Sequence, residues 1–424
     1  MPCGFEPAIM KKRYGVLLLS AVLVSLTMRP AWAPAGWIHE LASKRSKPAE
    51  NNLDPLTREL LRKYEEYVNF SMSEEGIPGA AVAIVKDGRV IFEKGFGVKN
   101  IDLKDSVNSH TVFRLASLSK GFAPVIMGML KEEGKLNWDD KVVEYLPDFE
   151  LRSASQTKAI SIRHLLSHTV GLPPHSFDYS LDHGDTYERL AKRLKEVRLS
   201  FKPGEMHTYQ NITYSLVGDI AYKVKGKTYA QLLRDRIFTP LDMKDASTGY
   251  GAIMAAKNVA LPHKAGEKKF YFRTPISDLY YSAVPAAGIN ASASDMAQWL
   301  LLLLGHRPDL ISKQTLDEIY TPQVDLLKGA CNCWFWEPDK SYYALGWRVL
   351  DKEGQRILFH GGYVNSYRGE IAFSREDDLG IVVLSNTTSR FIGESTGTFF
   401  QMYRELKNTE KPREIPQTTT IPVN

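Results

Sequence analysis

The sharpest local feature of the sequence is Phe113-Arg114-Leu115-Ala116-Ser117-Leu118-Ser119-Lys120, followed by an apolar stripe at helical spacing, Phe122, Ile126, Met129 and Leu130. The spacing predicts a helix with Ser117 and Lys120 on one face of its first turn. Burial disfavours the charged form of a lysine, so a partly desolvated Lys120 can take the proton of Ser117 and create a nucleophile. The backbone N–H of Ser117 is then a candidate donor to an oxyanion. Ser-x-x-Lys also arises by chance, and an exposed serine and lysine on an ordinary helix is the alternative.

Two segments further along the chain extend this pattern. Tyr209-Gln210-Asn211 begins a helical stretch, and Phe359-His360-Gly361-Gly362 ends a predicted strand. Together with Ser117-x-x-Lys120, they resemble, in order, the three motifs of the penicillin-recognising serine hydrolases, the family of β-lactamases and penicillin-binding proteins. The resemblance is strongest to the class C β-lactamase branch, whose second motif is Tyr-x-Asn, and it covers about residues 55–405.

The resemblance implies a role for each motif residue. Ser117 attacks a carbonyl and becomes acylated, while Lys120 and Tyr209 form a coupled pair that moves its proton to the leaving group. Asn211 orients Lys120 and the substrate amide. The remaining expected site residues lie on the predicted strand edge, where Tyr363 supplies the second oxyanion N–H beside His360, Gly361 and Gly362. A glycine in a strand lets a substrate lie close to the backbone. Without the other motifs, Tyr209 and Asn211 read as an ordinary helix start.

The third motif departs from the family pattern. β-Lactamases and penicillin-binding proteins usually carry Lys-Thr-Gly where this chain has His360-Gly361-Gly362. The missing lysine and threonine are the groups that the resemblance assigns to the substrate carboxylate, and an unperturbed histidine is largely neutral near pH 7. We therefore expect a serine hydrolase of the esterase or D-aminopeptidase branch, acting on ester or amide substrates that include D-amino-acid or cell-wall peptides. The alternatives are a true β-lactamase with weak activity and a non-hydrolytic sensor that binds penicillin or peptidoglycan.

The first residues have the pattern of an export signal. The 424 residues carry a formal net charge of +5. Lys11, Lys12 and Arg13 precede an apolar run over residues 15–28, and small residues at 33–35 offer a cleavage point, which predicts a signal peptide at 1–35. Most of the net positive charge, +3 of +5, lies there, and nothing in the remainder indicates nucleic-acid binding. We expect an exported protein, in a bacterial periplasm or secreted, and membrane-anchored if the signal is retained.

Alternating and helical periodicities predict one antiparallel sheet, built from both ends of the chain, that carries a helical insertion. The resemblance implies an α+β fold of the β-lactamase/transpeptidase type, with an antiparallel sheet flanked by helices and an inserted all-helical subdomain. Strands are expected at 79–97 as a hairpin and at 343–350, 356–359, 369–373 and 380–385. Helices are expected at 53–75, within 295–320 and at 393–406. The catalytic domain is placed at 53–407, with its α/β part at about 53–140 and 281–407 and the helical insertion at about 141–280. Residues 36–52 are expected to form a linker and residues 408–424 a disordered tail.

Two other patterns are weaker. His164 and His168 have the spacing of zinc ligands, but Leu165 stands where a zinc protease has glutamate, so no metal site is expected. The three cysteines cannot form a disulfide framework, and the Cys331-Asn332-Cys333 stretch reads as a packed loop, so stability must come from the core. Trp334 and Trp336 are candidates for an apolar substrate wall. No cofactor is implied, and the expected partners are a small-molecule or peptide substrate and peptidoglycan.

Overall fold

The computed structural model describes residues 53–267, 270–327 and 336–409. The predicted signal peptide (1–35), the linker (36–52), Trp334 and the two cysteines of 331–333 lie outside these ranges. The last helix, α14 (Arg390–Thr409), includes residues 408 and 409, which we expected in the tail; the rest of that tail is also outside the described residues. In the described ranges, no helix combines the length and the apolar character that a membrane span requires.

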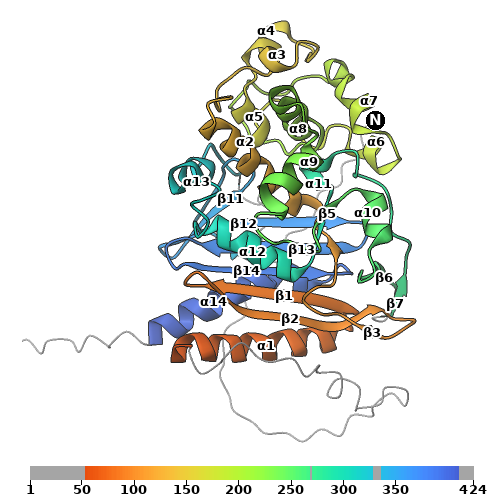
Figure 1. Cartoon of the computed structure of the whole chain (residues 1–424), viewed down its shortest axis with the longest axis vertical. Coiled ribbons are helices and arrows are strands. Elements are labelled where there is room, and N and C mark those ends of the chain that lie inside the picture. The colour runs from red at the N-terminus through yellow and green to blue at the C-terminus, as the bar shows by residue number, and fades with distance from the viewer. Residues whose placement is uncertain (1–52, 268–269, 328–335, 410–424) are drawn as a thin grey trace, which may run out of the picture. The chain divides into compact units, whose positions relative to one another are not determined.

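One antiparallel sheet organises the fold (Figure 1). Its nine strands lie in the order β3 (Asp105–Ser106), β2 (Arg89–Asn100), β1 (Gly79–Lys86), β14 (Leu379–Ser385), β13 (Tyr367–Ser374), β12 (Gln355–Val364), β11 (Arg348–Lys352), β10 (Lys340–Tyr343) and β9 (Val324–Asp325). Strands from both ends of the chain meet at the centre, where Val82 of β1 pairs with Val383 of β14. The predicted α+β class and its antiparallel sheet are confirmed.

The stretch 343–350 is not the single strand that its periodicity predicted. β10 ends at Tyr343 and β11 begins at Arg348, so the two form a hairpin. Gly346 lies in the turn with φ of +75°, a conformation that glycine adopts without a steric penalty. A Cβ at this position would lie 2.6 Å from the Tyr214 hydroxyl, so the turn also packs too closely for another residue. The apolar pattern continued through this turn because its residues are buried like those of the strands.

Helices cover both faces of the sheet. Alternate residues of β1 divide between two cores: Ala80, Val82 and Ile84 pack toward α1 (Pro55–Glu75) and α14, while the residues between them pack on the opposite face. Figure 1 shows α1 and α14 together on one side of the sheet and α12 (Ala293–Leu303) across the other. α1 begins at an Asp54 cap, whose carboxylate accepts the N–H of Thr57 at 2.9 Å. The opposite face also receives the helix that follows the predicted nucleophile.

The remaining described helices are η2 (Ala116–Gly121), α2 (Phe122–Glu132), α3 (Val142–Tyr145), α4 (Ala154–Ala159), α5 (Ile162–Leu166), α6 (Asp178–Asp182), α7 (Tyr187–Ala191), η3 (Leu194–Glu196), α8 (Ile212–Lys225), α9 (Tyr229–Leu233), η4 (Arg234–Phe238), α10 (Tyr250–Ala255), α11 (Val284–Ala287) and α13 (Lys313–Tyr320). Short strands accompany them: β4 (Phe113–Arg114), β8 (Ile289–Ala291) and β5 (Ser247–Thr248) form one small sheet, and β6 (His263–Ala265) and β7 (Tyr271–Arg273) another. Helices predominate among the regular elements of the range 141–280, which also includes β5, β6 and β7, and the limits of the predicted insertion stay predictions.

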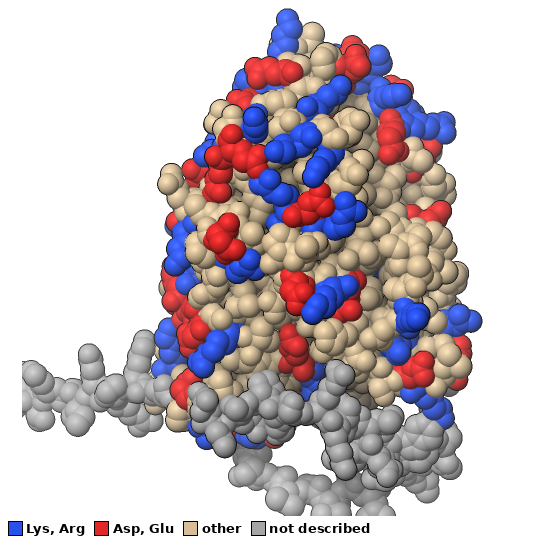
Figure 2. Space-filling model, viewed as in Figure 1, with Lys and Arg blue, Asp and Glu red and all other residues tan. Residues whose placement is uncertain are grey.

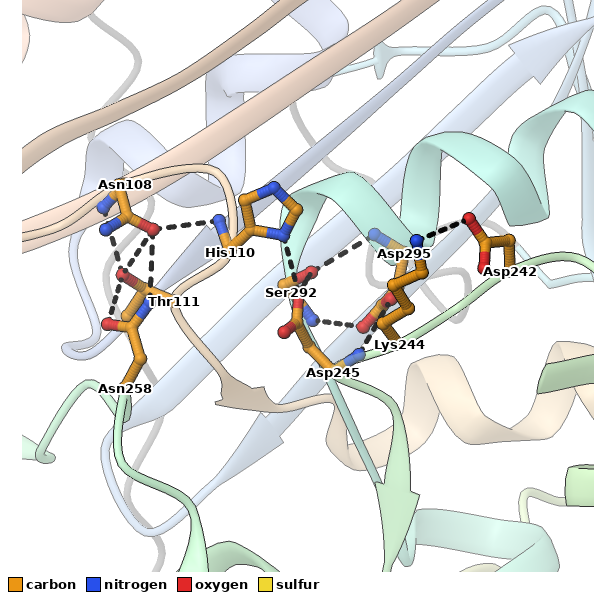
Figure 3. Close-up of polar contacts among 9 residues, drawn as sticks. All are labelled: Asn108, His110, Thr111, Asp242, Lys244, Asp245, Asn258, Ser292 and Asp295. Atoms are coloured by element: carbon orange, nitrogen blue, oxygen red, sulfur yellow. Dashed lines mark hydrogen bonds and ion pairs between the residues drawn. The ribbon is translucent and has the colours of Figure 1, made fainter. Parts of the chain in front are cut away.

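A polar network anchors α12 to neighbouring loops (Figure 3). Ser292 caps the helix, and the Asp295 carboxylate accepts the backbone N–H groups of Ser292 and Asp245 at 3.0 and 3.2 Å. Asp245 in turn accepts from the Ser292 hydroxyl and contacts His110 at 2.9 Å. Burial, followed by the nearby charge of Asp245, raises the pKa of Asp295 to about 6.

On the face of the molecule drawn in Figure 2, cationic and anionic side chains are interspersed, and neither sign dominates a large area.

Candidate active site

The predicted nucleophile lies on a 3₁₀ turn rather than on the first turn of an α-helix. β4 pairs with β8, the Leu115 N–H donates to the Ile289 carbonyl at 2.9 Å, and η2 then carries Ser117 and Lys120 directly into α2. In a 3₁₀ helix, side chains three residues apart lie one above the other, so the Ser-x-x-Lys spacing stacks the two groups. Ala116, just before Ser117, has φ of +49°, a left-handed conformation that costs an L-residue about 1 kcal/mol. Tertiary packing therefore holds this turn in place.

Lys120 is fully buried and has three polar neighbours. Its Nζ donates to the Asn211 Oδ1 at 2.7 Å and to the carbonyl of Ala286 in α11 at 3.0 Å, and it lies 3.4 Å from the Ser117 Oγ. The pKa of Lys120 is lowered to about 7, mainly by burial; the charge of Asp178 opposes this shift and the charge of Arg348 adds to it. An uncharged amine is therefore accessible next to the serine at neutral pH.

Asn211 links Lys120 to an acid that the sequence did not reveal. Its Nδ2 donates to both carboxylate oxygens of Asp178, at 2.9 and 3.0 Å, while its Oδ1 accepts from Lys120. His175 Nδ1 also contacts Asp178, at 2.7 Å. The two bonds from Asn211 fix the amide with its oxygen toward Lys120. Asn211 thus lies where the expected orienting role requires it, and Asp178 holds it in that orientation.

Tyr209 lies against the same lysine. Lys120 Nζ is 4.5 Å from the centre of the Tyr209 ring, and the ring is also 4.4 Å from that of His168. Burial raises the pKa of Tyr209, although the charge of Arg348 and a side-chain hydrogen bond with Ser117 oppose the shift. The phenol therefore keeps its proton at neutral pH. Ser117, Lys120, Tyr209 and Asn211 are brought together as predicted, while their roles stay predictions.

The strand β12 approaches the nucleophile through Gly362. A Cβ built on Gly362 would lie 2.5 Å from the Leu115 carbonyl oxygen and 3.1 Å from the Ser117 nitrogen, so only glycine fits. Gly361 faces the other side, toward Glu370 and Phe359. Because η2 begins at Ala116, the Ser117 N–H lies in the first turn, where backbone donors have no partner within the helix. The next N–H along β12 is that of Tyr363, whose side chain is 60% exposed.

β12 also presents an open edge at this point. Its pairing with β11 runs from Gln355 to Phe359, where Phe359 is opposite Arg348, while on its other side the pairing with β13 continues to Val364. In the described part of the chain, residues 360–364 thus have no strand partner on the β11 side. An unpaired edge offers backbone donors and acceptors to an extended ligand.

His360 is buried as a neutral side chain. It is fully inaccessible, its Nδ1 donates to the Gly361 carbonyl at 2.8 Å, and its Nε2 accepts from the Tyr343 hydroxyl at 3.3 Å. Burial holds the pKa of His360 well below its usual value, and the charges of Arg348 and Lys120 act in the same direction. Both ring nitrogens therefore have partners within the protein. His360 is adjacent to the site as predicted, but it brings no positive charge.

Arg348 is the second site residue that sequence reasoning missed. It begins β11, is only 6% exposed, and its guanidinium carbon lies 5.9 Å from the centre of the Tyr209 ring and 5.8 Å from that of Tyr343. A basic residue inside the apolar strand pattern predicted at 343–350 was the available signal. Asp178 left no such signal, because it lies in an irregular polar stretch.

The remaining expectations concern a metal site and an apolar substrate wall. His164 Nδ1 accepts the Ser161 N–H at 3.1 Å in the cap of α5, whereas His168 follows the end of that helix and accepts from the Gln210 N–H at 3.1 Å. Among the described residues, no group of His, Cys, Asp and Glu could hold a metal ion. Trp336 was expected in a substrate wall, but it is 5% exposed and packs beside Phe359 and Phe400 in the core under α14, so that prediction is wrong.

The chain is similar to known proteins over most of its length. The family model described as Beta-lactamase matches residues 57–396. Protein flp of Staphylococcus aureus (strain MW2) is 27% identical over 342 residues, which cover 80% of this chain and 65% of that protein. The unguisins hydrolase ungD' of Aspergillus campestris is 25% identical over 361 residues, covering 80% of this chain and 63% of its own length. The chain thus spans less than two thirds of these two relatives.

A solved structure shows the same fold. The octameric penicillin-binding protein homologue from Pyrococcus abyssi superposes with a TM-score of 0.70 at 25% sequence identity, covering 83% of this chain and 78% of that one. The matched 83% of this chain is more than either the sheet or the helical region comprises by itself, so the match extends over both.

Proposed function

Because the chain belongs to the beta-lactamase family, whose members are generally serine hydrolases, we propose that it hydrolyses ester or amide bonds through an acyl-enzyme on Ser117. The observation that carries this proposal is the buried Lys120, whose amine lies 3.4 Å from the Ser117 Oγ and has a pKa of about 7. A base is most effective when its pKa is near the working pH. An ordinary exposed lysine would be almost entirely protonated there.

Acylation then proceeds with defined proton movements. Uncharged Lys120 takes the Ser117 proton while Oγ bonds to the substrate carbonyl carbon, and the backbone N–H groups of Ser117 and Tyr363 stabilise the oxyanion. The bond to the leaving group breaks as that group receives a proton from Tyr209, which Lys120 then reprotonates. The raised pKa of Tyr209 supports its assignment as the proton donor rather than the resting base. Water repeats the sequence on the acyl-enzyme and regenerates Ser117.

The substrates proposed are short esters and peptides, including those with D-amino acids or derived from cell walls. One support is the third motif, in which His360 is neutral and engaged with Tyr343 and Gly361, so the family's usual lysine has no direct replacement there. Another is the relative that is named a hydrolase. We expect slow or absent β-lactam turnover for the same reason.

The test compares the purified chain with its Ser117→Ala variant on p-nitrophenyl esters, D-Ala-ending peptides and a chromogenic cephalosporin. Intact-mass measurement detects the acyl-enzyme. We expect ester or peptide hydrolysis that Ser117→Ala abolishes. Activity that survives this change would refute the mechanism. Acylation without turnover would favour the sensor alternative, and cephalosporin hydrolysis as fast as that of a resistance enzyme would contradict the substrate proposal.

Export is part of the proposal and rests on the sequence pattern of residues 1–35 alone. Terminal sequencing of the protein recovered after expression with its full leader tests it. A mature chain that begins near residue 36 is expected, and a retained leader would favour the membrane-anchored form.

A further inference from the structure

His175 and Asp178 form a hydrogen-bonded pair beside Tyr209. The His175 Nδ1 contacts the Asp178 Oδ2 at 2.7 Å, and the centre of the imidazole ring lies 5.5 Å from that of the Tyr209 ring. The His175 N–H also donates to the Tyr209 carbonyl oxygen at 2.8 Å, which holds this loop against the second motif. Asp178 therefore contacts two groups of the site, the amide of Asn211 and the imidazole of His175.

The contact with Asp178 leaves one nitrogen of His175 free. A carboxylate accepts hydrogen bonds, so in the neutral ring Nδ1 carries the hydrogen and Nε2 has the lone pair. Nε2 has no hydrogen-bond partner among the described residues, and 56% of the side chain is exposed. A carboxylate at Nδ1 orients the imidazole and stabilises the imidazolium that forms when Nε2 takes a proton. His175 thus has the arrangement of a general base that is open to solvent.

Hydrolysis of an acyl-enzyme needs a base that water can reach. Lys120, the proposed base of acylation, is fully buried, whereas the hydrolytic water arrives from solvent. Tyr209 has a raised pKa and keeps its proton at neutral pH, so it is a donor in the resting enzyme. His175, by contrast, combines exposure with a free nitrogen next to the Tyr209 ring. The water step therefore has a base of its own at the solvent side of the site.

We propose that His175 is a further catalytic residue, the general base for the water that hydrolyses the acyl-enzyme on Ser117. The water oxygen bonds to the acyl carbonyl carbon while one water proton passes to Nε2. The bond from that carbon to the Ser117 Oγ then breaks as Oγ receives the proton of Tyr209, and His175 returns its proton to Tyr209 through solvent. The acid product leaves, and every group regains its starting protonation state. This inference rests on the proposed function, because it concerns the second half of the same reaction.

The experiment separates acylation from deacylation with p-nitrophenyl acetate. The burst of p-nitrophenolate reports acylation, the steady-state rate reports turnover, and intact mass measures the acetyl-enzyme. His175→Asn is the test variant: asparagine tolerates the φ of +59° found here, and its amide can still donate to Asp178, but it cannot act as a base. We expect kcat to fall about 100-fold, the lower end for general-base catalysis, and acetyl-enzyme to accumulate. The burst rate and kcat/KM should stay near the wild-type values.

Two further variants complete the test. His183→Asn is the matched control, because His183 follows α6, is exposed and contacts the Tyr179 carbonyl at 2.7 Å, so kcat should not change. His175→Gly keeps the left-handed backbone and leaves space for added imidazole, which should restore turnover.

The outcomes distinguish this inference from the proposed function. A kcat that His175→Asn leaves unchanged, or a loss that falls equally on the burst rate and the steady-state rate, overturns the role of His175 while acylation of Ser117 stands. Hydrolysis that survives Ser117→Ala overturns the proposed function instead.

Discussion

The Asp178→Asn substitution should move the acid limb of the pH profile to lower pH. Deprotonated Lys120 is the proposed base, so kcat/KM should rise about tenfold per pH unit below pH 7 and level off above it. The charge of Asp178 raises the pKa of Lys120, against burial and the charge of Arg348. Replacing the carboxylate with an amide removes that support for the charged amine. The pKa of Lys120 must then fall, and the enzyme keeps more of its activity in acid.

The size of the shift follows from the hydrogen-bonded chain. One amide separates the two charges, with bonds of 2.7 Å to Lys120 and 2.9 Å to Asp178. At roughly 7 Å and an effective dielectric constant of about 20, a unit charge contributes ~2 kcal/mol, or ~1.5 pKa units. Because 16% of the Asp178 side chain remains exposed, we expect a shift of about one unit. At pH 5.5 the variant should then retain roughly eightfold more of its own maximal activity than wild type.

The assay is a pH profile of kcat/KM on a neutral p-nitrophenyl ester, normalised to each plateau, because the variant also loosens the hold on Asn211 and lowers the maximum. Asp182→Asn removes a charge from the same helix α6 without a contact to Asn211, and its limb should not move. An acid limb that stays in place or moves upward in Asp178→Asn would refute the reasoning.

Three further predictions concern the strand, the proton donor and stability. Gly362→Ala should lower kcat/KM by about 100-fold, since a shift of about 1 Å at the reacting groups costs that much, whereas Gly251→Ala, whose Cβ meets nothing within 4 Å, should leave it unchanged. Tyr209→Phe should lower kcat/KM by ~10²–10⁴-fold, in contrast to the exposed Tyr222→Phe. Because the pKa of Asp295 is raised in the folded state, its contribution to stability is complete below pH 3.8 and is lost as the pH rises through about 6. Between pH 3.8 and 7, the free energy of unfolding of Asp295→Asn, measured with denaturant, should therefore increase by ~3 kcal/mol relative to that of wild type. A wild type whose free energy of unfolding increases relative to the variant contradicts this.

The site residues that could be predicted are those whose positions follow from local spacing or from a family motif. Ser117 and Lys120 are three residues apart, and helical geometry alone places them on one face. Tyr209, Asn211 and the strand residues at 360–363 are distant in sequence, and only the resemblance to a known family brought them to the same site. The fold followed from similar information, because the hairpin at 79–97 and the terminal helix have regular periodicities.

The parts that were missed depend on tertiary packing. The 3₁₀ turn at Ser117 has the same apolar pattern as an α-helix, and the positive φ of Ala116 leaves no mark on a sequence. Asp178 acts through its contact with Asn211, 33 residues away, and through its charge on Lys120, from a stretch without periodicity. Trp336 has the aromatic character of a substrate wall, but it packs against Phe359 of β12 and Phe400 of α14 in the core.

Burial explains both the reactive lysine and the neutral histidines around it. Desolvation opposes charge on every group, so it brings Lys120 into the physiological range and holds His168 and His360 uncharged. Burial also raises the pKa of Glu370, which is bonded to Arg368 and Thr396, to about 7, so two buried groups titrate in the same interval. The Asp178→Asn profile distinguishes them, because the partners that act on Glu370 are Arg368, Thr396 and Arg348, whereas Asp178 acts on the lysine. A limb that moves with Asp178 therefore belongs to Lys120.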